Sequence, residues 1–105
     1  MKITLTPMRL DAKLALSRKD DVLTINGDVY DFGPLPDGAT LPREAVRCDW
    51  LASDVERIDG VLHLTLILPH GTAAPVETRF PAGLELTRSG PVDLPPYDTE
   101  IADVD

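Results

Sequence analysis

Residues 22–32 read Val-Leu-Thr-Ile-Asn-Gly-Asp-Val-Tyr-Asp-Phe, and this stretch decides the fold. An Asn-Gly pair between two β-rich runs predicts a two-residue hairpin, because both residues tolerate the positive φ of a type I′ turn. Pairing outward from the turn predicts four cross-strand pairs: Ile25–Asp28, Thr24–Val29, Leu23–Tyr30 and Asp21–Phe32. The side chains expected on the core face are those of Leu23, Ile25, Tyr30 and Phe32.

A second hairpin is predicted over residues 54–68, where Asp59-Gly60 supplies the same turn signal. Leucines at positions 62, 64, 66 and 68 repeat with period two, which predicts a central strand with one buried face. Across the turn, the expected pairs are Val55–Leu64, Glu56–His63 and Arg57–Leu62, with Glu56 and His63 on the opposite side from the leucines.

The rest of the chain is divided by ten prolines and seven glycines, too many for long helices. Shorter strands are predicted at residues 2–6, 13–17, 76–80 and 84–88. Pro7 lacks an amide donor, so the first strand is expected to be an edge or to be bulged there. The remaining predictions are a coil at 33–42, one helical turn starting near Pro42, anchors at Trp50 and Leu51, a loop at 69–75 and a turn at 89–91.

The predicted fold class is therefore all-β: a single small antiparallel β-sandwich or partly open barrel of about seven short strands with two tight hairpins. A chain of 105 residues has the length of one domain. We expect this β domain to span residues 1–94. Residues 95–105 are acidic and nearly without apolar side chains, which predicts a flexible, disordered tail.

The net charge of −8 bears on partners. Residues 1–92 carry 10 basic and 13 acidic side chains, and the last 13 residues add five acids and no base. Such a chain is repelled by nucleic acids and anionic membranes, so neither is an expected partner. The longest apolar stretch, residues 62–68, is far shorter than the ~20 residues of a membrane helix. Cys48 is the only cysteine, which fits a cytoplasmic protein without disulfides, and the N-terminal residues do not form a signal peptide.

Residue types that carry chemistry are present but do not form a known catalytic or metal-binding pattern. His63, His70 and Cys48 lack a recognised metal spacing, and we interpret them as a cross-strand histidine, a solvated loop histidine and an inert thiol beside Trp50. None of Ser17, Ser53 and Ser89 lies in a nucleophile elbow. The acidic pairs Asp20/Asp21 and Asp54/Glu56, and the turn residues Asp28 and Asp59, match no calcium loop. Among the aromatic residues, only Tyr97 is expected to be exposed. We therefore predict no catalytic, metal or cofactor site.

One resemblance adds context. Residues 22–27, 31–42, 56–60, 62–66 and 68–71 together resemble a set of small uncharacterised proteins encoded in phage and prophage tail gene regions. The likeness covers residues 2–95 and carries no catalytic residues. It implies an accessory or assembly role in a phage tail, in the host cytoplasm or on the virion.

Three functions are considered. The first is a non-enzymatic interaction module that contacts a protein partner, such as a phage tail component, through an open sheet edge or an exposed patch. Residues 33–42 and 69–75 are its candidate contact loops, and a second copy of the chain is another candidate partner. The alternatives are an acidic inhibitor that mimics nucleic acid, with its charge in the tail, and a small-molecule-binding β module, which requires a concave pocket.

Overall fold

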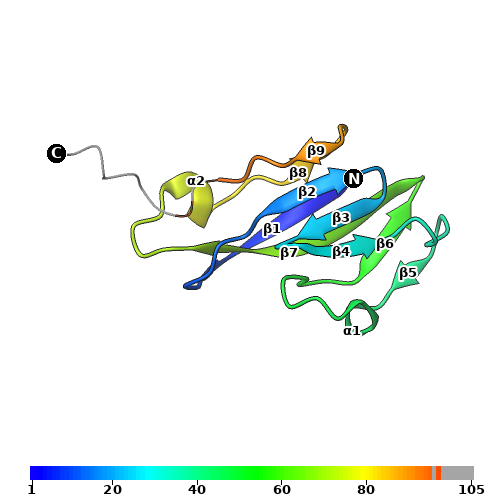
Figure 1. The fold of residues 1–105 in the computed structure, drawn as a ribbon, viewed down its shortest axis with the longest axis horizontal. Coiled ribbons are helices and arrows are strands. Elements are labelled where there is room, and N and C mark those ends of the chain that lie inside the picture. The colour runs from blue at the N-terminus through cyan, green and yellow to red at the C-terminus, as the bar shows by residue number, and fades with distance from the viewer. Residues whose placement is uncertain (96, 98–105) are drawn as a thin grey trace.

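The computed structural model describes residues 1–95 and 97. In chain order, its elements are β1 (Lys2–Arg9), β2 (Leu16–Lys19), β3 (Val22–Ile25), β4 (Asp28–Asp31), β5 (Thr40–Leu41), α1 (Arg43–Val46), β6 (Val55–Ile58), β7 (Val61–His70), α2 (Val76–Arg79), β8 (Leu84–Glu85) and β9 (Gly90–Pro91). They form two sheets, shown in Figure 1: the first sheet in the order β5-β6-β7-β1-β8 and the second sheet in the order β4-β3-β2-β9. The prediction of a mostly β fold is confirmed.

The first sheet is mixed, which corrects the prediction of an antiparallel fold. Strand β1 runs parallel to β7 over its whole length, from the pair Lys2–His63 to the pair Arg9–His70. Parallel neighbours require a long crossover, and here β2, β3 and β4 of the second sheet, followed by β5 and β6, lie between them in the chain. This pairing places Ile3 and Leu5 beside the leucine stripe of β7. The two sheets remain separate, so the fold is not a closed barrel.

Both predicted hairpins are confirmed. Asn26 and Gly27 have φ values of 50° and 89°, and Asp59 and Gly60 have 50° and 80°, as a type I′ turn requires. The register of the first hairpin is the predicted one, and the Phe32 amide donates to the Asp21 carbonyl at 2.9 Å.

The second hairpin departs from its predicted register after Glu56–His63. Its ladder is interrupted there and resumes at the bridge Leu51–Leu66. The expected Val55–Leu64 pair is therefore absent. Two extra residues, Ser53 and Asp54, lie on the β6 side, and the Ser53 hydroxyl accepts the Thr65 amide at 2.8 Å.

The core lies between the sheets. All four leucines of the β7 stripe are at most 4% exposed, and Val55 and Leu23 are completely buried. The buried cluster consists of Ile3, Leu5, Leu16, Leu23, Ile25, Phe32, Leu51, Val55, Leu62, Leu64, Leu66 and Leu68. Trp50 and Tyr30 pack against it half-buried, so the connection after α1 is anchored as predicted.

Several short segments differ from the prediction. The segment expected as a strand at 76–80 instead forms the one-turn helix α2 (Val76–Arg79), because Pro75 presets the φ of a helix start and Pro81 follows closely. The strand expected at 84–88 is limited to Leu84–Glu85, and residues 90–91 of the expected turn pair with β2. The predicted coil at 33–42 contains β5, and the strand expected at 13–17 begins only at Leu16. The helical turn is confirmed as α1, with Pro42 as its N-cap.

Both ends of the described chain are hydrogen-bonded to other segments: the Met1 amine donates to the Leu86 carbonyl at 3.1 Å, and Tyr97 contacts Leu10 and Gly71. On the side of β1 away from β7, the described ladder with β8 covers only Lys2 and Ile3, and Pro7 lies beyond it, as expected for a proline-containing strand. The Tyr97 hydroxyl donates to the Leu10 carbonyl, and the Gly71 amide donates to the Tyr97 carbonyl at 2.8 Å. Tyr97 is thus half-buried, whereas Phe80 is 75% exposed, which reverses the expected exposure of these rings. The predicted tail otherwise lies outside the described residues.

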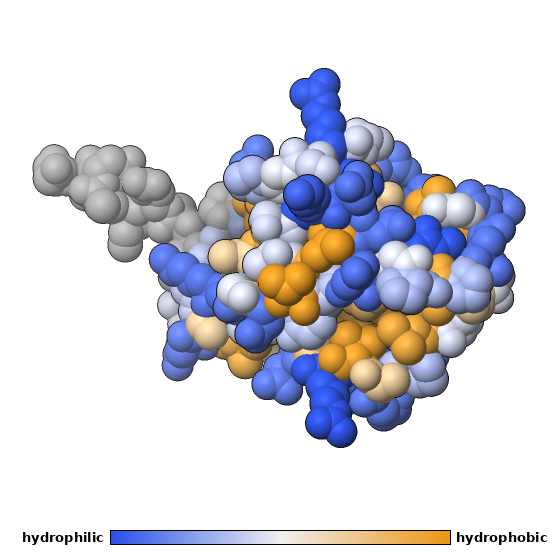
Figure 2. Space-filling model, turned by 45° about the vertical axis from the view of Figure 1, so that its right-hand side comes forward, coloured by the Kyte–Doolittle hydropathy of each residue, from blue (hydrophilic) through white to orange (hydrophobic). Residues whose placement is uncertain are grey.

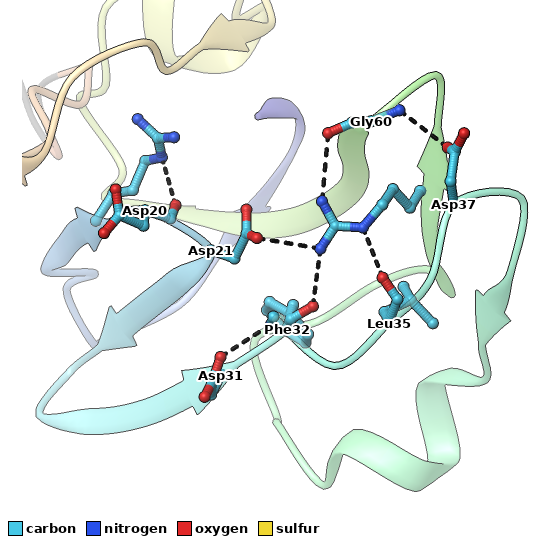
Figure 3. Close-up of polar contacts among 10 residues, drawn as sticks. Asp20, Asp21, Asp31, Phe32, Leu35, Asp37 and Gly60 are labelled. Atoms are coloured by element: carbon cyan, nitrogen blue, oxygen red, sulfur yellow. Dashed lines mark hydrogen bonds and ion pairs between the residues drawn. The ribbon is translucent and has the colours of Figure 1, made fainter.

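Arg57 of β6 joins the first sheet to the connection between β4 and β5. Its side chain is only 11% exposed. Its Nε donates to the Leu35 carbonyl at 2.6 Å, and its Nη2 donates to the Phe32 carbonyl at 3.0 Å and to Asp21 Oδ2 at 3.2 Å. In Figure 3, dashed lines join Asp21, Phe32, Leu35 and Gly60 to one guanidinium, that of Arg57, whose Nη1 lies 3.3 Å from the Gly60 carbonyl. The planar fork of arginine suits several acceptors that converge from different directions.

We predict that Arg57→Ala lowers the free energy of unfolding by about 3 kcal/mol, because two carbonyls at the core boundary lose their donor. Arg57→Lys should recover only part of this loss, because one ammonium cannot replace the fork. Urea unfolding measures both, with the exposed Arg88→Ala as the matched control, expected within about 0.5 kcal/mol of the wild type. Equal effects of Arg57→Ala and Arg88→Ala would contradict the role given to Arg57.

Candidate functional site

The outer face of the first sheet carries an open groove of about 870 Å³. A row of side chains crosses it in register: Glu56 on β6, His63 on β7, Lys2 on β1 and Glu85 on β8. Lys2 Nζ and Glu85 are 3.8 Å apart, and both side chains are more than half exposed, so this ion pair contributes little stability. The predicted Glu56–His63 pairing is confirmed, and charges of both signs lie side by side along the row.

The groove also brings Ser53 and Asp54 near His63, a combination found in hydrolases. A serine nucleophile needs its hydroxyl hydrogen-bonded to the histidine. Here the Ser53 hydroxyl donates to the Asp54 carbonyl at 2.8 Å and accepts the Thr65 amide at the same distance. Ser53 therefore completes the interrupted β6–β7 ladder, and the hydroxyl is oriented by the backbone.

The other candidate residues are spread through the fold. His70 is the last residue of β7 rather than part of a solvated loop, because the strand continues through Pro69, and its Nδ1 lies 2.9 Å from the Gly71 carbonyl. Cys48 is half-buried in the connection after α1. Ser17 pairs within the second sheet, and Ser89 accepts the Asp20 amide. Among residues 1–95 and 97, no group of three or more histidine, cysteine, aspartate or glutamate side chains could hold a metal ion.

The border strand β4 presents unpaired backbone groups. In its hairpin, hydrogen-bonded pairs alternate with non-bonded pairs. The bond from the Phe32 amide to the Asp21 carbonyl shows which pairs are the bonded ones. Asp28, Tyr30 and Phe32 therefore bond toward β3. The amides and carbonyls of Val29 and Asp31 point away from the sheet, and no hydrogen bond to them occurs within the described part of the chain.

The other sheet borders offer less. Strands β5, β8 and β9 contain two residues each, and β9 includes a proline. The open side of β1 includes Pro7, and α2 contacts this strand. Of the borders that the structure describes, β4 is thus the longest without a proline, and long edges without such protection are templates for pairing with another strand.

Exposed apolar side chains lie in separate patches on the face that Figure 2 shows. Figure 2 shows small orange patches separated by hydrophilic residues on the face turned toward the viewer. The large exposed apolar side chains are Met8, Val29, Ile58, Val76 and Phe80, and Val29 on β4 is 66% exposed. A sheet edge, with its backbone groups, is therefore a better defined docking feature than an apolar patch.

No protein-family model, curated protein or solved structure matches the chain.

No helix within the described residues is long and apolar enough to span a bilayer.

Tyr30 supports β4 from its inner side. The pKa of Tyr30 is raised to about 12 by a side-chain hydrogen bond with Cys48, by burial, and by the charges of Cys48, Asp28 and Asp49. The connection after α1 thus contacts the side chain of Tyr30. The outward amides of Val29 and Asp31 stay open.

Sequence reasoning did not identify two features. It expected an open edge somewhere but did not assign it to β4, because strand order depends on long-range pairing. It also gave no role to Arg57, although the predicted register placed this residue on the same face as Leu62. A charged residue on a core-facing position was the available signal for the Arg57 network.

We predict that stability decreases as the pH rises from 10 to 12, because the folded protein favours the neutral Tyr30 phenol and its pKa is raised from 10.0 to about 12. This contribution is fully present below pH 10. Tyr30→Phe should remove it and flatten the stability curve in that window relative to the wild type, whereas Tyr97→Phe should not. Cys48→Ala should shift the tyrosinate absorbance transition of Tyr30 toward pH 10. An unchanged transition in Cys48→Ala would contradict the hydrogen bond.

Proposed function

We propose that this protein is a non-enzymatic interaction module of β-sandwich type that binds a protein partner by adding the partner's strand to β4. The observation that carries the proposal is the open border of β4, where the backbone groups of Val29 and Asp31 point outward and have no hydrogen-bond partner among residues 1–95 and 97. β-Strand addition uses such groups for affinity and neighbouring side chains for specificity.

The energetics set a limit on this mode. Two outward residues can make four main-chain hydrogen bonds, each with a net contribution of about 1 kcal/mol. Four such bonds alone correspond to a dissociation constant of about 1 mM. Tighter binding therefore requires side-chain contacts, for which exposed Val29 is available.

The loops that the sequence suggested as contacts are less suitable. Residues 33–42 make several hydrogen bonds to the second hairpin. The Arg57 side chain donates to the Leu35 carbonyl, the Gly38 amide donates to the Arg57 carbonyl at 2.7 Å, and Asp37 accepts the Gly60 amide. In the second loop, Gly71 and Ala74 are buried. Both loops thus have structural roles, and β4 is the more accessible surface.

The partner that we propose is a phage tail component, on the strength of the resemblance to proteins encoded in phage tail gene regions. The accessory role would be exercised in the host cytoplasm or on the virion. The competing acidic-mimic function depends on five acids near the C-terminus, of which only Asp93 lies among the described residues.

A proline substitution at the border tests the proposal. Proline is tolerated on sheet edges where the amide faces solvent, so Val29→Pro should leave the fold intact but remove one outward donor. In phage-producing cells, we expect a tail component to be captured by the wild type and lost with Val29→Pro.

The matched control is Val76→Pro, which replaces an exposed valine at the first position of α2, where proline is compatible with the helix start. This variant should keep the partner. Circular dichroism verifies the fold of both variants. A tail component captured equally by Val29→Pro, or no tail component captured by the wild type, would argue against the proposal.

A further inference from the structure

We infer that the segment that adds to β4 is a basic, extended strand with the local pattern basic–apolar–β-branched–basic, read from its N-terminus. This inference rests on the proposed binding at β4 and identifies the chemistry of the partner. It follows from the register that the outward groups of β4 impose and from the charges at the two ends of the strand.

The register follows from hydrogen bonding. All pairs within the second sheet are antiparallel, so we take the incoming strand to be antiparallel as well. Val29 and Asp31 must then each face a partner residue in a hydrogen-bonded pair. The partner residues opposite Tyr30 and Asp28 form non-bonded pairs with them. Successive partner residues, from N- to C-terminus, therefore lie opposite Asp31, Tyr30, Val29 and Asp28.

The side chains of β4 select the residue type at each of these positions. Val29 lies on the exposed face and favours a β-branched neighbour, and the half-buried ring of Tyr30 favours an apolar or aromatic one. Asp28 and Asp31 are exposed, and no ion pair to either occurs within the described residues. Opposite charges directly across an antiparallel pair are favourable, so both ends of the motif call for lysine or arginine.

The same charges disfavour a second copy as the occupant. Antiparallel pairing of two β4 strands about Tyr30 would place Val29 opposite Asp31 of the other copy and bring four carboxylates onto one edge. In this register no carboxylate faces a basic residue across the edge, and a net charge of −8 on each copy adds long-range repulsion. The charge pattern therefore favours a basic partner over self-association.

The inference is tested with two end-blocked peptides whose central residues are Lys-Phe-Val-Lys or Glu-Phe-Val-Glu, titrated to millimolar concentration against isotope-labelled protein at low salt. We expect the basic peptide to shift the amide signals of Val29 and Asp31 and to bind at least about tenfold more tightly than the acidic one. A spin label at the N-terminus of the basic peptide should broaden Gly33 more than Gly27, because the strands run antiparallel.

Charge-reversal variants separate local recognition from general attraction. Asp28→Lys combined with Asp31→Lys should reverse the preference in favour of the acidic peptide. Glu77→Lys combined with Asp93→Lys makes the same change in net charge on α2 and beyond β9, and it should preserve the preference of the wild type. Asp31→Asn keeps an acceptor for the Gly33 amide, which Asp31 binds at 2.8 Å, and should lower affinity for the basic peptide without disturbing this turn.

The outcomes distinguish the two proposals. Equal affinity for both peptides, or an equal loss with the control pair Glu77→Lys/Asp93→Lys, overturns the inferred motif even if tail-component capture remains sensitive to Val29→Pro. Absence of any shift at Val29 and Asp31 with either peptide also overturns it. Capture that is insensitive to Val29→Pro overturns the proposed function itself.

Discussion

The buried guanidinium of Arg57 is the interaction on which the arrangement of the two sheets depends. It reaches from β6 to the carbonyls of Phe32 and Leu35, immediately after β4 ends. The chain is therefore turned from the second sheet toward the first, where Thr40 and Leu41 pair with β6 as β5. Asp21 provides a single charge partner at 3.2 Å, but the carbonyl acceptors determine where the chain goes.

This turn has a direct consequence for the surface. Because the segment that follows β4 is used to cover the edge of β6, it does not return to cover β4. The first sheet gains a short protective strand, and the second sheet keeps an open border of four residues. The acidic residues at the two ends of β4 protect this border against pairing with itself, since natural edge strands use charge in this way. The same acids leave it accessible to a strand of opposite charge.

Local signals made both hairpins and the buried face of β7 predictable. Asn26-Gly27 and Asp59-Gly60 specified both turns, and the alternation of leucines in β7 specified its buried face, because turn geometry and period-two burial are short-range properties. The parallel pairing of β1 with β7 was not predictable, since it joins segments about 60 residues apart. Helix α2 was mistaken for a strand because Val76 and Phe80 suggested β structure, whereas the prolines that flank the segment decided its conformation.

The presence of an open sheet edge was predictable from the sequence, but the strand that forms it was not. Hairpin patterns indicated a β fold with an open sheet edge, but the strand order that makes β4 the border is fixed by tertiary contacts. The sequence shows that Arg57 is a charged residue on a core-facing position, but it does not show its acceptors, because these are backbone carbonyls.

Amide hydrogen exchange of the free protein tests the central claim most directly. If β4 is an open border, the Val29 and Asp31 amides exchange at nearly unprotected rates, while the Tyr30 amide between them, bonded toward β3, exchanges far more slowly. Protection of Val29 and Asp31 comparable to that of Tyr30 would show that the border is already occupied, and it would contradict the account.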